Sequence, residues 1–150
     1  MIVLRPVQTA DIDIFYEHQA DPVAVEMAAT TARDQASHRE LWTKRILVNP
    51  DGVARTVVVD GVVAGNIISW IDSGERMVGY RYGRAFWGRG IATEALRLYV
   101  DQLEERPLYA DVAVHNIGSQ RVLEKAGFRR ISDAPKIEDD GVKLYPYRLD

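Results

Sequence analysis

The fold of this chain is decided by the stretch Phe86-Trp87-Gly88-Arg89-Gly90-Ile91-Ala92-Thr93-Glu94-Ala95-Leu96, in which a glycine turn leads straight into a helix. A strand-like run over residues 77–83 comes just before it. Such a turn presents free backbone N–H groups at the positive end of a helix dipole, where phosphate groups bind. Glycines without a Cβ let a ligand approach the backbone closely. We therefore expect the chain to bind a cofactor that carries a pyrophosphate.

The composition is typical of one globular domain over residues 1–150. The chain is 47% hydrophobic and 27% charged, with a formal net charge of −3, which argues against nucleic acid as its main partner. No apolar run is long enough to span a bilayer and no signal peptide is visible, so we expect a cytoplasmic protein without a membrane partner. The absence of cysteine excludes disulfides, thiolate metal sites and an acyl-cysteine intermediate.

Hydrophobic periodicity and turn residues predict about seven strands and four helices along the chain. The strands are expected at residues 1–5, 54–59, 62–70, 77–83, 108–114, 128–131 and 142–149. The helices are expected from Thr9, as N-cap, and over residues 32–48, 91–106 and 117–126. Residues 21–30 are expected to be a loop with at most a helical turn. The order β-α-α-β-β-β-α-β-α-β-β predicts an α/β (α+β) layer structure around a mixed, mostly antiparallel sheet.

This order, with a glycine turn after the fourth strand, resembles that of the GCN5-related N-acetyltransferase (GNAT) superfamily. Residues 86–96 carry the resemblance together with a second block, Asn116-Ile117-Gly118-Ser119-Gln120-Arg121-Val122-Leu123-Glu124-Lys125-Ala126-Gly127-Phe128. The similarity is greatest to the RimJ/RimL-like branch, which acetylates the N-termini of ribosomal proteins. The two blocks lie in the C-terminal half, and the N-terminal half matches only in the order of its elements. The resemblance implies a sheet that splays between its fourth and fifth strands.

The resemblance also implies that the glycine turn grips the pyrophosphate of acetyl-CoA, the acyl donor. Trp87 departs from the superfamily pattern, which has Arg or Gln at that position, and we expect its indole to pack beneath the turn. The residues assigned in this way to the cofactor are Tyr82, Gly83, Trp87, Gly88, Arg89, Gly90, Ile91, Ala92, Thr93, Asn116 and Ser119.

The second block has a physical interpretation of its own. Asn116 is a favoured N-cap, accepting from the backbone N–H near Ser119, and Gly127 is a favoured residue just after a helix end. Phe128 would then contact Leu123, the apolar pair of a Schellman ending. The resemblance adds that Asn116 holds the pantetheine arm and that Ser119 lies near the cofactor sulfur.

Acetyl transfer to an amine needs a neutral amine, a polarised thioester carbonyl and a proton for the departing thiolate. The resemblance places a backbone donor for the thioester oxygen near residues 80–83 and makes Ser119 the expected catalytic acid. Tyr82 and Tyr145 are alternatives, because a phenol is closer in pKa to a thiolate than a serine hydroxyl is.

The general base is left open by the sequence. Many members of the branch carry a glutamate where this chain has Met77. Glu26, Asp72, Glu75 and His115 remain as candidates, and none is favoured by its spacing. His18 and His38 are expected on the surface of helices, and the spacing of the histidines does not indicate a metal site.

These features favour two functions over a third. The first is an N-acetyltransferase that moves an acetyl group from acetyl-CoA to a small-molecule amine or a protein N-terminus by direct attack in a ternary complex. The second is a non-catalytic CoA-binding or regulatory domain of the same fold. A dinucleotide-binding module is disfavoured, because Thr93 stands where that motif needs its third glycine. Dimerisation through the C-terminal strands is a further expectation.

Overall fold

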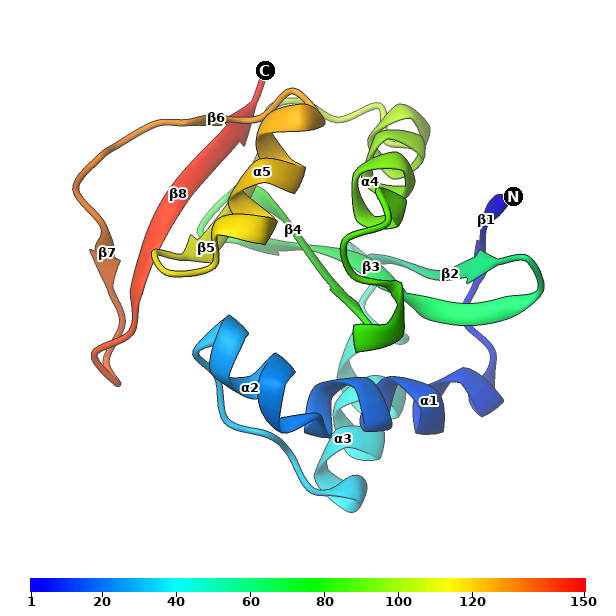
Figure 1. The fold of residues 1–150 in the computed structure, drawn as a ribbon. Helices are drawn as coiled ribbons and strands as arrows, with labels where there is room; N and C mark the ends of the chain where they lie inside the picture. Colours follow the sequence, from blue (N-terminus) through cyan, green and yellow to red (C-terminus); the bar gives the residue numbers. More distant parts are fainter.

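A mixed sheet of eight strands crosses the middle of the molecule in the computed structural model, which describes residues 1–150 (Figure 1). The strands follow the order β1-β2-β3-β4-β5-β8-β6, and the short β7 pairs with β8. All neighbours are antiparallel except β4 and β5. The strands are β1 (Ile2–Pro6), β2 (Val53–Val59), β3 (Val62–Asp72), β4 (Glu75–Tyr82), β5 (Leu108–Ala113), β6 (Arg129–Arg130), β7 (Lys136–Ile137) and β8 (Lys143–Leu149).

Five α-helices cover the two faces of this sheet (Figure 1). On one face lie α4 (Ile91–Gln102) and α5 (Ile117–Lys125). Below the other face lie α1 (Thr9–Ala20), α2 (Pro22–Ala28) and α3 (Gln35–Leu41), the last continued by a π-helical turn, η1 (Trp42–Ile46). A single 3₁₀ turn, η2 (Arg84–Phe86), connects β4 to the glycine turn. The predicted α/β fold class is confirmed, with one more strand and one more helix than expected.

The extra helix, α2, corrects the expectation of a loop at residues 21–30. Asp21 caps it by accepting a hydrogen bond of 2.9 Å from the Val23 N–H, and Pro22 occupies its first turn. Proline is well tolerated there because the first N–H groups of a helix have no intrahelical partner. The Asp-Pro pair was therefore a helix-start signal. The first helix does begin at Thr9, but its N-cap position is Gln8, whose N–H donates to the Asp11 carboxylate at 2.8 Å.

The sheet splays between β4 and β5, as predicted. These parallel strands pair only where Arg76 lies beside Leu108 and Met77 beside Tyr109, although β4 continues to Tyr82 and β5 to Ala113. Beyond this point the facing edges of the two strands have no strand partner. The splay leaves backbone N–H and C=O groups of β4 free for another molecule.

Two hydrophobic clusters hold the helices to the sheet. The larger one packs α4 and α5 against the sheet, and Tyr99, Leu96 and Tyr147 are among its fully buried members. The smaller one, Ile12, Phe15 and Trp42, fixes α1 and η1 to the other face. Both faces of the sheet are therefore packed against helices on either side of the gap between β4 and β5.

Candidate active site

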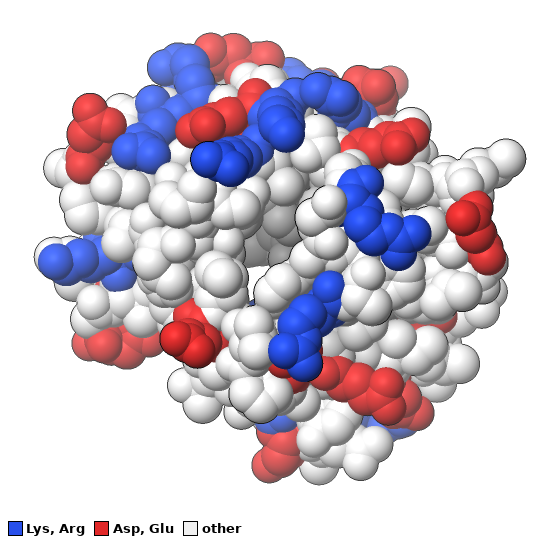
Figure 2. All heavy atoms as spheres, viewed as in Figure 1, with Lys and Arg blue, Asp and Glu red and all other residues white.

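A cavity of about 430 Å³ lies at the splay of β4 and β5. Figure 2 shows this face of the molecule hollowed below α4 and α5 and above α2, with Lys and Arg side chains interspersed with Asp and Glu over the upper side. No carboxylate lines the cavity. Its walls come from α2, the end of β4, the glycine turn and the first turns of α4 and α5. The lining residues are Ala24, Met27, Ala28, Tyr80, Arg81, Tyr82, Phe86, Trp87, Gly88, Gly90, Ile91, Ala92, Thr93, Asn116, Gly118, Ser119, Arg121, Val122 and Lys125.

The glycine turn borders this cavity and has the backbone geometry that the sequence suggested. Gly88 and Gly90 adopt φ values of +73° and +75°, a region that residues with a Cβ rarely occupy. A Cβ on either glycine would meet no atom within 4 Å, so both face open space. The helix α4 begins immediately afterwards at Ile91, and its first N–H groups have no intrahelical acceptor. The turn can therefore hold an anionic group at the positive end of α4.

The other residues predicted around the turn fall into two groups. Trp87 lines the cavity and donates its indole N–H to the Tyr82 carbonyl at 3.0 Å, so its side chain ties the turn to the end of β4. Arg89 and Gly83 do not line the cavity. The Arg89 guanidinium lies 5.7 Å from the centre of the Phe86 ring. A Cβ on Gly83 would lie only 2.6 Å from Nε2 of His18, so this glycine allows α1 to pack closely on β4.

A basic rim, Arg121 and Lys125, borders the cavity on α5 and was missed by the sequence analysis. The two residues are four apart and therefore share one face of the helix. Arg97 of α4 lies next to them and donates to the Lys125 carbonyl at 2.6 Å. The i, i+4 spacing of these two basic residues is the sequence feature that could have predicted the basic rim. The rim supplies positive charge close to a site that already favours anions.

The start and end of α5 match the predicted caps. Asn116 Oδ1 accepts from the Ser119 N–H at 3.1 Å. At the other end Phe128 N–H donates to the Leu123 carbonyl at 3.0 Å and Gly127 N–H to the Glu124 carbonyl at 3.1 Å, the two bonds of a Schellman motif. Both Leu123 and Phe128 are buried in the larger core cluster.

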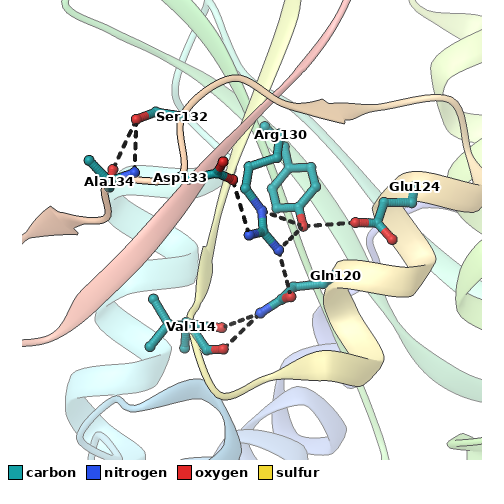
Figure 3. A network of polar contacts seen from close by, with 9 residues as sticks. Val114, Gln120, Glu124, Arg130, Ser132, Asp133 and Ala134 are labelled. Atoms are coloured by element: carbon teal, nitrogen blue, oxygen red, sulfur yellow. Dashed lines mark hydrogen bonds and ion pairs between the residues drawn. The ribbon is translucent and has the colours of Figure 1, made fainter.

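A polar network behind α5 fixes the loop that carries Asn116 (Figure 3). The buried Gln120 amide donates to the carbonyls of Ala113 and Val114, at 3.2 and 2.9 Å. Its oxygen accepts from Arg130 at 3.2 Å, and the Arg130 guanidinium lies 3.8 Å from the centre of the Tyr145 ring. These contacts connect β5, α5 and the segment after it, so they hold α5 against the end of β5.

The shortest side-chain contact in the cavity joins Tyr80 to Ser119, whose hydroxyl oxygens are 2.8 Å apart. Burial raises the pKa of Tyr80 to about 12, although the Ser119 hydrogen bond acts in the opposite direction. The Tyr82 hydroxyl is buried without a hydrogen-bond partner, and desolvation raises its pKa strongly. From the sequence, Tyr80 was expected only as one of residues 80–83, which were to provide a backbone donor for the thioester oxygen. Its pairing with Ser119 depends on the tertiary contact of β4 with α5.

Antiparallel pairing determines which backbone groups of β4 face the gap. The Gly83 N–H donates to the Ala64 carbonyl on β3 at 2.9 Å. Because successive residues of a strand point their N–H groups to opposite sides, those of Tyr82 and Tyr80 point away from β3. Both lie beyond the paired part of β4 and β5. Two donors are therefore directed into the splay.

The candidate bases are far apart in the structure. Asp72 and Glu75 close the β3–β4 hairpin, at the end of β4 opposite to the cavity. His115 is exposed, and its Nε2 lies 2.9 Å from the backbone oxygen of Glu26, which connects the end of β5 to α2. No cluster of three His, Cys, Asp or Glu side chains has metal-binding geometry.

The expectation that His38 lies on the surface was wrong. Its side chain is buried at 4% exposure, next to Tyr16 and Trp42, and burial lowers its pKa to about 4. His18 is half-buried against β4, and burial lowers its pKa as well. The His38 imidazole is thus neutral at pH 7.

Residues 1–129 match the family model described as "Acetyltransferase (GNAT) domain", and the chain belongs to this family. The probable N-acetyltransferase YjcK of Bacillus subtilis (strain 168) is 46% identical over 63 residues, which are 39% of this chain and 35% of that protein. The uncharacterized N-acetyltransferase p20 of Bacillus licheniformis is 25% identical over 99% of this chain and 92% of its own length.

Solved structures show the same fold at low sequence identity. An aminoglycoside acetyltransferase, AAC(6')-Ib, in complex with coenzyme A superposes with a TM-score of 0.78 at 20% identity, over 99% of this chain and 95% of that one. Spermidine N-acetyltransferase from Vibrio cholerae, with CoA and spermine, gives a TM-score of 0.83 at 14% identity, over 99% and 94%. None of the helices described here has the length and apolar character of a membrane span.

Proposed function

We propose that this protein is an N-acetyltransferase that moves an acetyl group from acetyl-CoA to a primary amine by direct attack in a ternary complex. The observation that supports this most strongly is the cavity itself. It joins an anion-binding glycine turn, two free N–H groups of β4 and the Ser119–Tyr80 hydroxyl pair in one space. The CoA complexes of proteins with the same fold support the choice of cofactor.

The residues that line the cavity can bind the phosphate groups of CoA. The open space above Gly88 and Gly90 admits a pyrophosphate to the N–H groups of Ile91, Ala92 and Thr93. The basic rim of Arg121 and Lys125 adds charge for the phosphates. Of the other residues predicted to bind the cofactor, Tyr82 and Trp87 line the cavity, whereas Gly83 and Arg89 do not.

The pantetheine arm lies in the splay in this proposal, beside the unpaired edge of β4. Asn116 uses its side-chain oxygen for the helix cap, so its NH₂ group remains available to the arm. The backbone N–H groups of Tyr80 and Tyr82 donate to the thioester oxygen as negative charge builds up there.

In the transfer step, the acceptor nitrogen attacks the thioester carbon, a C–N bond forms and the C–S bond breaks. Ser119 donates a proton or a hydrogen bond to the departing thiolate, and the Tyr80 hydroxyl supports Ser119 from 2.8 Å. The amine loses its own proton to solvent, since no carboxylate lines the cavity. His115 and Glu26, which meet where β5 ends beside α2, do not line the cavity but stay the nearest side-chain candidates for this role.

Two finer assignments belong to the same proposal. We place the chain in the RimJ/RimL-like branch, on the strength of Trp87 in the glycine turn, and this leaves protein N-termini among the candidate acceptors. The names of similar structures add aminoglycosides and spermidine. Dimerisation through the C-terminal strands stays a prediction.

A non-catalytic CoA-binding domain is the second candidate, favoured by Met77 in place of a glutamate and by the lack of any carboxylate in the cavity. A thiol-release assay with acetyl-CoA and a broad panel of amines separates the two. We expect release that depends on both acetyl-CoA and one class of amine. Binding of acetyl-CoA without release for any amine would establish the non-catalytic domain instead.

A further inference from the structure

Arg81 is a cationic residue of the cavity wall for which the proposed transfer chemistry has no use. Side chains alternate along a strand, and the neighbours Tyr80 and Tyr82 belong to the cluster under α4 and α5. Arg81 therefore lies on the other face of β4, toward α1 and α3. Its charge acts there on both His18 and His38. Arg81 also lines the cavity, so it stands where the cavity meets the layer of N-terminal helices.

The Arg81 guanidinium has no partner in the protein. No hydrogen bond or ion pair involves it, and burial is the sole influence on its pKa, which is lowered. The two nearby histidines cannot supply a counter-charge, because an imidazole side chain is either neutral or cationic. By contrast, Arg84, three residues further on, is paired with Asp21 at 3.1 Å. The guanidinium nitrogens keep contact with solvent, but burial of the side chain leaves the charge partly desolvated, so a counter-charge would stabilise it.

The rest of the cavity reinforces this charge. Its cationic lining residues are Arg81, Arg121 and Lys125, and it has no acidic one. Because Arg121 and Lys125 serve the cofactor phosphates in the proposed function, Arg81 is the cation left beside the acceptor. A polycationic acceptor would bring ammonium groups next to it without any carboxylate to receive them. The N–H groups of the glycine turn already serve the cofactor phosphates in the proposed function. Arg81 lies on the opposite side of β4 from α4, has no role in binding the cofactor and can therefore bind the acceptor.

We propose that the acceptor is an amine that also carries a carboxylate, with an α-amino acid as the simplest member of this class, and that Arg81 binds the carboxylate. This inference rests on the proposed function and names the substrate class of the same site. The planar guanidinium matches a carboxylate with two parallel hydrogen bonds, which also fixes the orientation of the amine beside it. Binding would neutralise the one cation of the cavity that lacks both a partner and a cofactor role.

Matched acceptors test the proposal without altering the protein. Thiol release from acetyl-CoA is measured with the common amino acids, with their carboxamides, and with spermidine and kanamycin. We expect release with one or more amino acids and at least tenfold lower kcat/KM with the corresponding carboxamide. The carboxamide has the lower amine pKa, because no carboxylate stabilises its ammonium form, so without a role for Arg81 it would be the better acceptor. Equal or better turnover of carboxamides or polyamines would overturn the inference while leaving the proposed function intact.

Variants then assign the effect to Arg81. In Arg81→Gln we expect the kcat/KM for the amino acid to fall by roughly 30- to 100-fold, the loss typical of a charge-assisted pair, with the preference over the carboxamide abolished. Arg81→Lys keeps the charge without the planar fork and should fall in between. The control Arg84→Gln should behave like the wild type.

Calorimetry with acetyl-CoA distinguishes the remaining outcomes. An Arg81→Gln protein that binds acetyl-CoA within twofold of the wild type and unfolds at a similar temperature has lost only acceptor binding, as the inference requires. A matching loss of acetyl-CoA affinity would make Arg81 a cofactor ligand and overturn it. If the wild type releases no thiol with any of the amines tested, the proposed function fails, and the inference fails with it.

Discussion

Ser119 and Tyr80 are 39 residues apart in sequence, yet their hydroxyl oxygens form the shortest side-chain contact in the cavity. Ser119 is held by the first turn of α5 and Tyr80 by the unpaired end of β4. A serine hydroxyl alone is a weak acid, and the pKa of Tyr80 is raised to about 12. Neither residue is therefore a strong proton donor by itself, and their contribution depends on acting as a pair.

Removal of either hydroxyl should slow the chemical step. We expect Ser119→Ala to lower kcat by about 10- to 100-fold and Tyr80→Phe by about tenfold, because a positioned proton donor contributes on this order or more. The affinity for acetyl-CoA, measured by calorimetry, should change little in either variant. The Ser119→Ala/Tyr80→Phe double variant should lose no more than the Ser119→Ala variant, since the two hydroxyls act together. A larger loss in Tyr82→Phe than in Ser119→Ala would return the acid role to Tyr82, the alternative from the sequence.

Sequence patterns predicted the cap at Asn116 and the glycine turn because these features depend on local geometry, whereas Ser119 was assigned by the family resemblance. Asn116 caps the helix that follows it, and Gly90 takes a φ that its neighbours could not. The importance of Tyr80 and Arg81 was not visible, because it comes from the partners that the fold provides or withholds. An unpaired Arg81 has no sequence signature, and the Tyr80–Ser119 contact exists only once β4 and β5 have separated.

Two predictions for the helices of the N-terminal half were wrong. The α2 segment has small apolar residues after a proline, a composition that we interpreted as a loop, yet Asp21 and Pro22 supply a complete helix start. His38 in α3 was expected to be exposed because histidine is polar, but the ring packs beside Trp42. Tertiary packing decided the burial of His38, whereas the helix start of α2 was a local signal that the composition of the segment concealed.

The buried His38 in α3 should make the stability of the fold depend on pH. Its pKa is about 4 in the folded chain and near 6.5 when unfolded, so the unfolded state binds more protons between these values. The free energy of unfolding should therefore decrease as the pH falls from about 6.5 to about 4, by about 2–3 kcal/mol from this residue. Urea unfolding at pH 7 and pH 4.5 measures the loss.

The variant His38→Phe provides the comparison, because phenylalanine fills a similar space among Tyr16 and Trp42 without titrating. We expect this variant to lose clearly less stability over the same pH range. His18, whose pKa is also lowered, accounts for part of the loss that remains. The Asp11 carboxylate, with a lowered pKa from its contact with Arg5, contributes only at lower pH. Identical pH profiles of the wild type and His38→Phe would contradict the assignment.

Across the molecule, one topological feature connects fold and function. Strands β4 and β5 are the only parallel neighbours in the sheet, and they separate after two paired residues. The glycine turn follows β4 and α5 follows β5, so both cofactor blocks of the sequence open onto the same gap (Figure 1). The order of elements could be predicted from hydrophobic periodicity and turn residues, and the splay from the family resemblance that these two blocks carry. The unpaired state of Arg81 could not, since it depends on how the N-terminal helices pack against β4.

Calorimetric titration of acetyl-CoA into the wild type, Gly90→Ala and Gly74→Ala tests the account of this cavity. Gly90 and Gly74 share a φ near +80° and open space around a Cβ, but Gly74 lies in the β3–β4 hairpin away from the cavity. Both substitutions should cost about 1–2 kcal/mol of stability through backbone strain. We expect micromolar binding by the wild type and by Gly74→Ala, at least tenfold weaker binding by Gly90→Ala, and no heat with NAD. Absence of acetyl-CoA binding by the wild type, or equal affinity in all three proteins, would contradict the assignment of the glycine turn to the cofactor.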